Sequence, residues 1–79
     1  MKKTLDNLFA GLCAENHYSP KVKEKGETHF SVTFEQNPEI KELREIILIT
    51  ETLLTAKGYS PFIIPAYCKE ILQEIEIFL

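Results

Sequence analysis

The stretch Ile40–Lys57, IKELREIILITETLLTAK, decides how the rest of the chain must be arranged. At about 100° per residue, its apolar side chains fill a helical arc of roughly 200°. The arc is made of Ile40, Leu43, Ile46, Ile47, Ile49, Leu53, Leu54 and Ala56. A surface helix usually has a narrower stripe, so we expect this helix to be covered on two sides, by its own chain or by a partner. Its centre, Leu43, Ile47 and Leu54, is predicted to be core.

Both ends of this helix are marked in the sequence. Asn37-Pro38-Glu39 combines a capping residue, a proline suited to the first turn and an acidic group at the positive end of the dipole. Gly58 is predicted to close the helix in a left-handed conformation, with Tyr59 packing back on Leu54 as in a Schellman motif.

A first helix precedes it, because apolar residues recur at positions i, i+3, i+4, i+7 and i+8. They are Leu5, Leu8, Phe9, Leu12 and Cys13. The helix is predicted to begin at Thr4 or Lys2 and to end near Asn16 in a left-handed conformation, before Ser19-Pro20.

A β-hairpin is predicted over about Tyr18–Phe34. The segment from Thr28 to Phe34 alternates strictly and directs Phe30, Val32 and Phe34 to one face. We expect a three-residue loop over 24–26 with Gly26 left-handed, which pairs Val22 with Thr28 and Lys23 with Glu27. The other face would show Lys21, Lys23, His29, Ser31 and Thr33 to water. Two strands alone are weak, so helices must hold them or a partner strand must extend them.

The last segment is predicted to be a short linker followed by a helix from Pro65 or Ala66 to Phe78. The helical stripe would consist of Cys68, Ile71, Leu72, Ile75, Phe78 and Leu79, with Ile77 on the polar side. The predicted element order is α-β-β-α-α in one domain over 1–79. Strands between helices, without βαβ alternation, indicate an α+β fold with a two-stranded hairpin packed on helices.

Size and charge limit the functions open to the chain. Its 79 residues and 44% hydrophobic content suffice for one modest core, near the size where oligomerisation often helps stability. The first 34 residues carry a net charge of +1 and the rest −4, giving −3 overall. A basic footprint for duplex nucleic acid is therefore missing. Neither a secretory signal nor a membrane span is evident, so we expect a cytoplasmic protein with reduced thiols.

Residues that could carry chemistry are sparse. Cys13, His17, His29 and Cys68 match the ligand count of a zinc site, but no C-x-x-C pair exists and both cysteines lie on apolar stripes. No G-x-S-x-G motif and no glycine-rich phosphate loop is present. We therefore predict no metal, no cofactor and no enzymatic activity.

Two functional hypotheses remain. The leading one is a small acidic protein-interaction module, acting as a regulator, an assembly factor or an inhibitor of the kind carried by phages and other mobile elements. It would bind another protein, first of all a second copy, through the last two helices. The predicted contact residues are Leu48, Ile63, Ile64, Ile77 and Leu79.

The alternative is a nucleic-acid contact through the hairpin residues Lys21, Lys23, Lys25 and His29. Lysines on an edge strand also have a structural explanation, because they protect the edge against aggregation. Binding that weakens steeply with salt would separate the two explanations.

Overall fold

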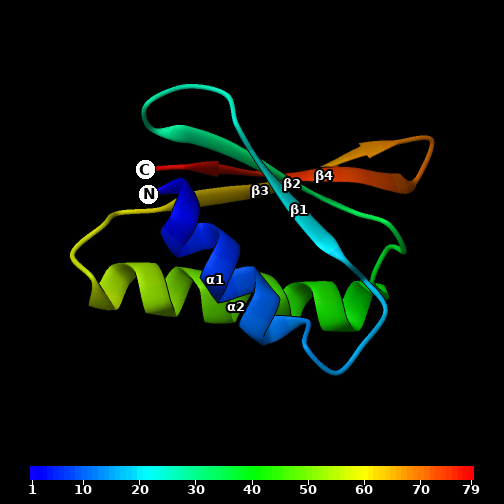
Figure 1. Cartoon of the computed structure of the whole chain (residues 1–79). Helices are drawn as coiled ribbons and strands as arrows, with labels where there is room; N and C mark the ends of the chain where they lie inside the picture. The colour runs from blue at the N-terminus through cyan, green and yellow to red at the C-terminus, as the bar shows by residue number, and fades with distance from the viewer.

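Four antiparallel strands form one sheet, and both helices lie on the same face of it (Figure 1). The computed structural model describes all 79 residues. The elements are α1 (Lys2–Leu12), β1 (Pro20–Glu24), β2 (His29–Phe34), α2 (Ile40–Ala56), β3 (Phe62–Cys68) and β4 (Ile71–Phe78). The strands lie in the order β1-β2-β4-β3. The fold is therefore α+β, with the element order α-β-β-α-β-β. Neither α1 nor α2 could span a membrane.

Helix α2 confirms the central helix and its predicted end. Gly58 has a φ of +96°, and the N–H groups of Gly58 and Tyr59 donate to the carbonyls of Thr55 (3.0 Å) and Leu54 (3.1 Å). These two bonds make a Schellman closure. At the other end, Glu39 and not Asn37 occupies the N-cap. The Asn37 side chain instead donates to the Leu72 carbonyl at 2.9 Å, which ties the start of α2 to β4.

Helix α1 confirms the first predicted helix, which begins at Lys2. Leu5 and Phe9 face the sheet and are almost completely buried, with Cys13 buried just after the helix. The left-handed ending at Asn16 was wrong, because Asn16 has no positive φ. Its side chain accepts a hydrogen bond from the Tyr18 N–H at 3.1 Å and so stabilises the turn that leads into β1.

The first hairpin is confirmed, but its predicted register is wrong. Val22 pairs with Val32 and Lys23 with Ser31, so the loop covers four residues, 25–28. Gly26 does not have a positive φ; its N–H and that of Lys25 both donate to the His29 carbonyl. The observed register places two buried valines opposite each other. Because the slip involves an even number of residues, each side chain keeps its predicted face.

The predicted last helix is wrong, because residues 62–78 form the β3–β4 hairpin. Strand β4 lies between β2 and β3, so it supplies the third strand that the first hairpin needs. From Glu74 to Ile77 polar and apolar residues alternate, as in a half-buried strand. The segment also has apolar residues at helical spacing, and these led to the prediction of a helix. Pro65 lies in the edge strand β3, where prolines are tolerated.

The turn between β3 and β4 lacks the sequence signal of a tight hairpin. Lys69 and Glu70 both have positive φ, of 52° and 69°, as a two-residue type I′ turn requires. Asn-Gly is the usual pair there, and neither Lys nor Glu favours this conformation. The hairpin is therefore imposed by burial of its strands and not by its turn.

Replacing Glu70 with glycine should stabilise the protein. Glycine adopts positive φ without steric cost, which outweighs its larger entropy loss, and we expect a gain of about 0.5–1 kcal/mol in the free energy of unfolding. Chemical denaturation followed by circular dichroism measures it. The matched control is Gly58→Ala, which should cost about 1 kcal/mol because alanine disfavours a φ of +96°. A destabilised Glu70→Gly protein would show that the turn is not strained.

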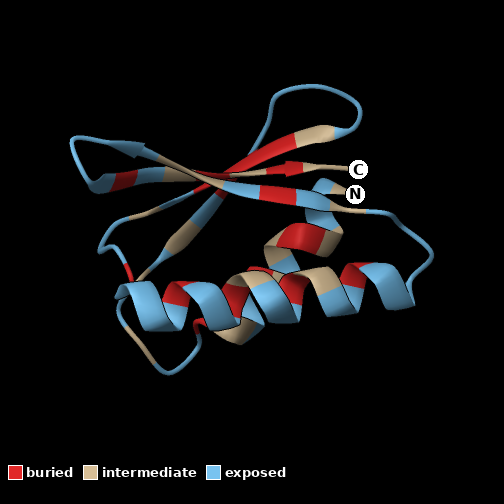
Figure 2. Cartoon of the chain, turned by 180° about the vertical axis from the view of Figure 1, so that it is seen from behind, coloured by how far each residue is buried: buried red, intermediate tan, exposed pale blue.

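The core lies between the sheet and the two helices (Figure 2). From the strands it takes Val22, Phe30, Val32, Ile63, Leu72, Ile75 and Ile77. Helix α2 buries Leu43, Ile46, Thr50 and Leu54, whereas Ile47 is only half-buried. The polar side chain of Thr50 can be buried in the core because its hydroxyl donates to the Ile46 carbonyl at 2.7 Å. The chain therefore covers α2 on one side only, and the rest of its wide apolar arc faces solvent.

Candidate protein-binding surface

The solvent side of α2 is unusually apolar over its C-terminal two-thirds. Between Ile46 and Ala56 the helix has a single charged residue, Glu51. Leu48 is 63% exposed, and Ile49 and Leu53 are each 42% exposed. Exposed Thr52 and Ala56 complete this surface, which we call the α2 patch: Leu48, Ile49, Thr52, Leu53 and Ala56. Single exposed apolar residues are ordinary, but a contiguous apolar group without charges is typical of a contact surface.

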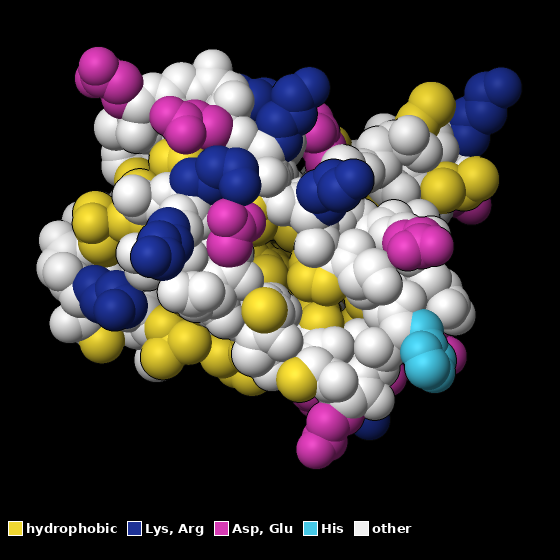
Figure 3. Space-filling model, viewed as in Figure 1, with side chains coloured by type: hydrophobic (Ala, Val, Ile, Leu, Met, Phe, Trp, Pro, Cys, Tyr) yellow, Lys and Arg dark blue, Asp and Glu magenta, His cyan; other side chains and the backbone are white.

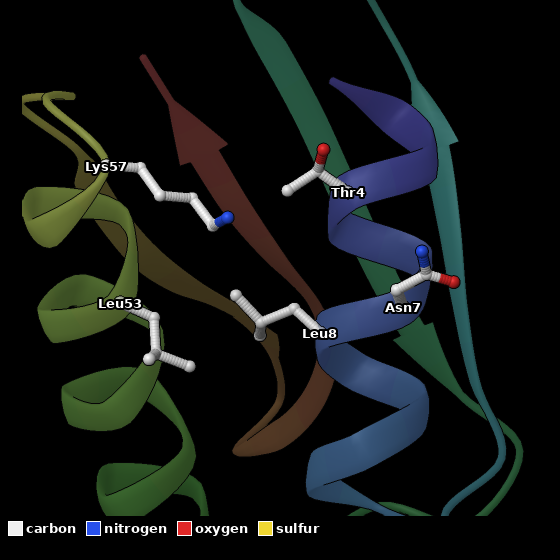
Figure 4. Close-up of a pocket in the computed structure, with 5 residues that line it drawn as sticks. All are labelled: Thr4, Asn7, Leu8, Leu53 and Lys57. Carbon is white, nitrogen blue, oxygen red and sulfur yellow. The ribbon is translucent and has the colours of Figure 1, made fainter.

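The α2 patch continues into a groove between the two helices (Figure 4). The groove measures about 380 Å³ and is lined by Thr4, Asn7, Leu8, Leu53 and Lys57. Leu8 on α1 and Leu53 on α2 project toward the space between the helices, and Lys57 extends over it from the end of α2. An apolar floor with polar groups at the rim can accept an apolar side chain from a partner.

A hydrogen bond holds the N-terminal end of α2 to the segment before β1. The Tyr18 hydroxyl donates to the Glu42 carboxylate, and the Tyr18 ring packs edge-on against Phe34. The hydrogen bond, some desolvation and the negative charge of Glu42 together raise the pKa of Tyr18 to about 12. The contact therefore links the first turn of α2 to the segment before β1.

Alkaline titration should show this contact. Because the pKa of Tyr18 in the folded protein lies above the usual value near 10, the stabilisation is complete below about pH 10 and disappears as the pH rises through about 12. Tyrosinate absorbance should show one step near pH 12 that Tyr18→Phe removes. Glu42→Gln should move that step toward lower pH. A natural protein without a step near pH 12, or a step that Glu42→Gln leaves in place, would exclude the contact in solution.

The residues predicted to bind a partner are divided between surface and core. Leu48 lies in the α2 patch, and Ile64 is 39% exposed on the opposite face of the molecule. Ile63 and Ile77 are buried in the core, so their side chains cannot reach a partner in this conformation. Leu79 is half-buried at the chain end, where its N–H donates to the Thr28 carbonyl at 2.8 Å. The five residues therefore do not form one surface.

The outer face of the sheet carries no helix (Figures 1 and 2). Lys21 and Lys23 project from β1 on this side, as predicted, and are exposed. Lys25 pairs with Glu74 at 3.0 Å, and His29 contacts Glu76 at 3.1 Å. The four residues of the predicted nucleic-acid contact thus gather on one half of this face. Figure 3 shows Lys and Arg side chains, in dark blue, spread over the side of the molecule seen in Figure 1, with apolar atoms between them.

Ser31 departs from its expected exposure. It was predicted to face water, but it is 1% exposed, because it lies in the middle of the sheet between Lys23 and Glu76. Its hydroxyl oxygen has no hydrogen-bond partner, and nothing in the structure explains this.

The cysteines and histidines do not assemble into a site. Cys13 is buried and Cys68 is exposed, and both are free thiols. Burial raises the pKa of the Cys13 thiol, which disfavours the reactive thiolate. The structure brings no three metal-ligating side chains together.

No protein-family model, no curated protein and no solved structure matches this chain. The sequence predicts Leu48 as a contact residue because it is an apolar side chain on the polar side of α2. Ile49 and Leu53 were placed in the arc and expected to be covered, and only the position of the sheet shows that they are not.

Proposed function

We propose that this protein is a small binding module that acts by contacting another protein through the α2 patch, and that its first partner is a second copy of itself. The observation that carries the proposal is the run from Ile46 to Ala56, which has one charge and exposes Leu48, Ile49 and Leu53. Burying apolar surface of this kind releases about 25 cal/mol per Å² of area removed from water. The isologous contact of a two-fold dimer would cover the same patch on both copies.

A binding module of this size can act as a regulator, an assembly factor or an inhibitor, since each needs only a complementary surface. The groove beside Leu53 adds a place for a partner side chain, with Lys57 at its rim. We place the protein in the cytoplasm, with reduced thiols and without an enzymatic reaction of its own. Aromatic residues and arginine usually dominate such contacts, so a patch of Leu and Ile supports modest affinity.

Light scattering over a concentration series tests the proposal. We expect a dimer at micromolar concentration for the natural protein and a monomer for Leu48→Glu, because the dimer would bury an unpaired carboxylate. The matched control is Ile71→Glu, which places the same charge at a 59% exposed residue of the β3–β4 hairpin and should leave the dimer intact. A natural protein that stays monomeric would overturn self-association. Dissociation by Ile71→Glu but not by Leu48→Glu would locate the contact elsewhere.

A further inference from the structure

Three aromatic rings form a row across the outer face of the sheet. In the register of the strands, His29 on β2 lies beside Phe78 on β4, and Phe78 lies beside Phe62 on β3. The His29 and Phe78 rings are stacked, with centroids 4.2 Å apart and planes inclined by 16°. Phe62 is tilted by 39° at 6.3 Å and is 62% exposed. The row therefore ends in an uncovered aromatic ring on a face that no helix covers.

Two lysines on the same face are free to contact an anion, although the protein as a whole is acidic. Of the carboxylates on this side of the sheet, Glu74 pairs with Lys25, Glu76 contacts His29, and Glu35 lines a hollow together with Lys21. Lys21 and Lys23 on the neighbouring edge strand β1 take part in no ion pair and are exposed. The ammonium groups of Lys21 and Lys23 are therefore available to phosphates. The net charge of −3 arises mainly from glutamates after Phe34.

We infer that the outer face of the sheet binds single-stranded nucleic acid. A base would stack on Phe62 and extend the row of rings, while phosphates of the same strand contact Lys21 and Lys23. Strands lie about 4.8 Å apart, so β1 and β3 are separated by about 14 Å, a distance that a short oligonucleotide spans. Aromatic rings on an open sheet beside a few lysines are the combination that single strands require, because their bases are free to stack.

A duplex does not fit the same surface. Its bases are paired and stacked internally, so Phe62 would have no base to contact, and only phosphates would remain as ligands. Two free lysines also supply only two phosphate contacts, which are too few to hold a duplex without contacts to its bases. The inference concerns the face opposite the α2 patch and does not depend on self-association.

Fluorescence anisotropy with a labelled oligothymidine of about 20 nucleotides tests the inference. We expect saturable binding at low ionic strength, with a slope of about −1.4 in log affinity against log salt for two phosphate contacts. Phe62→Ala should weaken binding about 5- to 140-fold through loss of one stacked base. The double variant Lys21→Glu with Lys23→Glu should abolish binding.

Two matched controls separate this face from the rest of the surface. Tyr59→Ala removes an aromatic ring that is 40% exposed in the loop after α2, and Lys57→Glu reverses a lysine at the interhelical groove. Both should bind the oligonucleotide like the natural protein. No binding at low salt, equal binding of a duplex of the same length, or equal losses in the controls would each overturn the inference. Since all the substituted residues are exposed, circular dichroism should show folded variants.

Discussion

Replacing Ile77 with alanine is expected to lower the free energy of unfolding by about 2–5 kcal/mol. Ile77 is fully buried in β4, the strand between β2 and β3, and its register partners are Phe30 and Ile63, which are also buried. The cavity left by alanine would therefore lie in the middle of the core. Domains of ordinary stability have about 5–15 kcal/mol in total, so the variant should be close to unfolding. Urea denaturation followed by circular dichroism measures the change.

The control for this prediction is Ile71→Ala in the same strand. Ile71 is 59% exposed, so its truncation should change the free energy of unfolding by no more than about 0.5 kcal/mol. The pair also tests the correction of the C-terminal segment, because a helix over these residues would bury Ile71 and expose Ile77. A large loss in Ile71→Ala together with a small loss in Ile77→Ala would contradict the β3–β4 hairpin.

Replacing Phe9 with alanine is expected to cost about 3–5 kcal/mol. Phe9 is 1% exposed, and with Leu5 it attaches α1 to the sheet. No other aromatic residue of α1 could fill the space. The loss should therefore destabilise the whole domain, because α1 covers the β1 side of the core.

Phe62→Ala is the matched control, since it truncates the same side chain at a 62% exposed position. Its loss should be well below that of Phe9→Ala, within about 1 kcal/mol. Denaturation curves with equal slopes for both variants would show that the change lies in stability and not in the extent of unfolding. Equal costs for the two truncations would mean that α1 does not pack on the sheet as described.

The elements that local chemistry specifies could be predicted from the sequence. Gly58 ends α2 because it is the residue that adopts a φ of +96° at little cost, and that signal needs no knowledge of the rest of the chain. The faces of the first hairpin follow from strict alternation. The register of the hairpin does not follow from alternation, because hairpin loops of several lengths direct the side chains to the same faces. The burial of Val22 opposite Val32 selects the observed register.

The β3–β4 hairpin could not be predicted from local signals. Its turn uses Lys69 and Glu70, which give no indication of positive φ, and its apolar residues fit a helical stripe as well as a strand. The segment forms strands because β4 pairs with the second edge of β2 and completes the sheet. This pairing is a tertiary interaction, which local sequence does not show. The weakness of a two-stranded sheet was the one observation in the sequence that indicated a missing strand.

The candidate site was predictable only in part, for the same reason. Leu48 faces solvent whatever covers the other side of α2. Ile77 was predicted to lie at the surface of a helix, but in the strand it is buried in the core. A helix and a strand direct the same side chain to different faces. The row of His29, Phe78 and Phe62 joins residues from three strands, two of which were not predicted.

Methyl NMR over a dilution series tests most directly whether the α2 patch is the contact surface. We expect the methyl resonances of Leu48, Ile49 and Leu53 to shift with protein concentration, because self-association would move these exposed groups out of water. The methyls of Ile64 and Ile71 serve as the internal reference and should not shift. No concentration dependence at any methyl, or shifts confined to Ile64 and Ile71, would contradict the assignment of the α2 patch as an interface between copies.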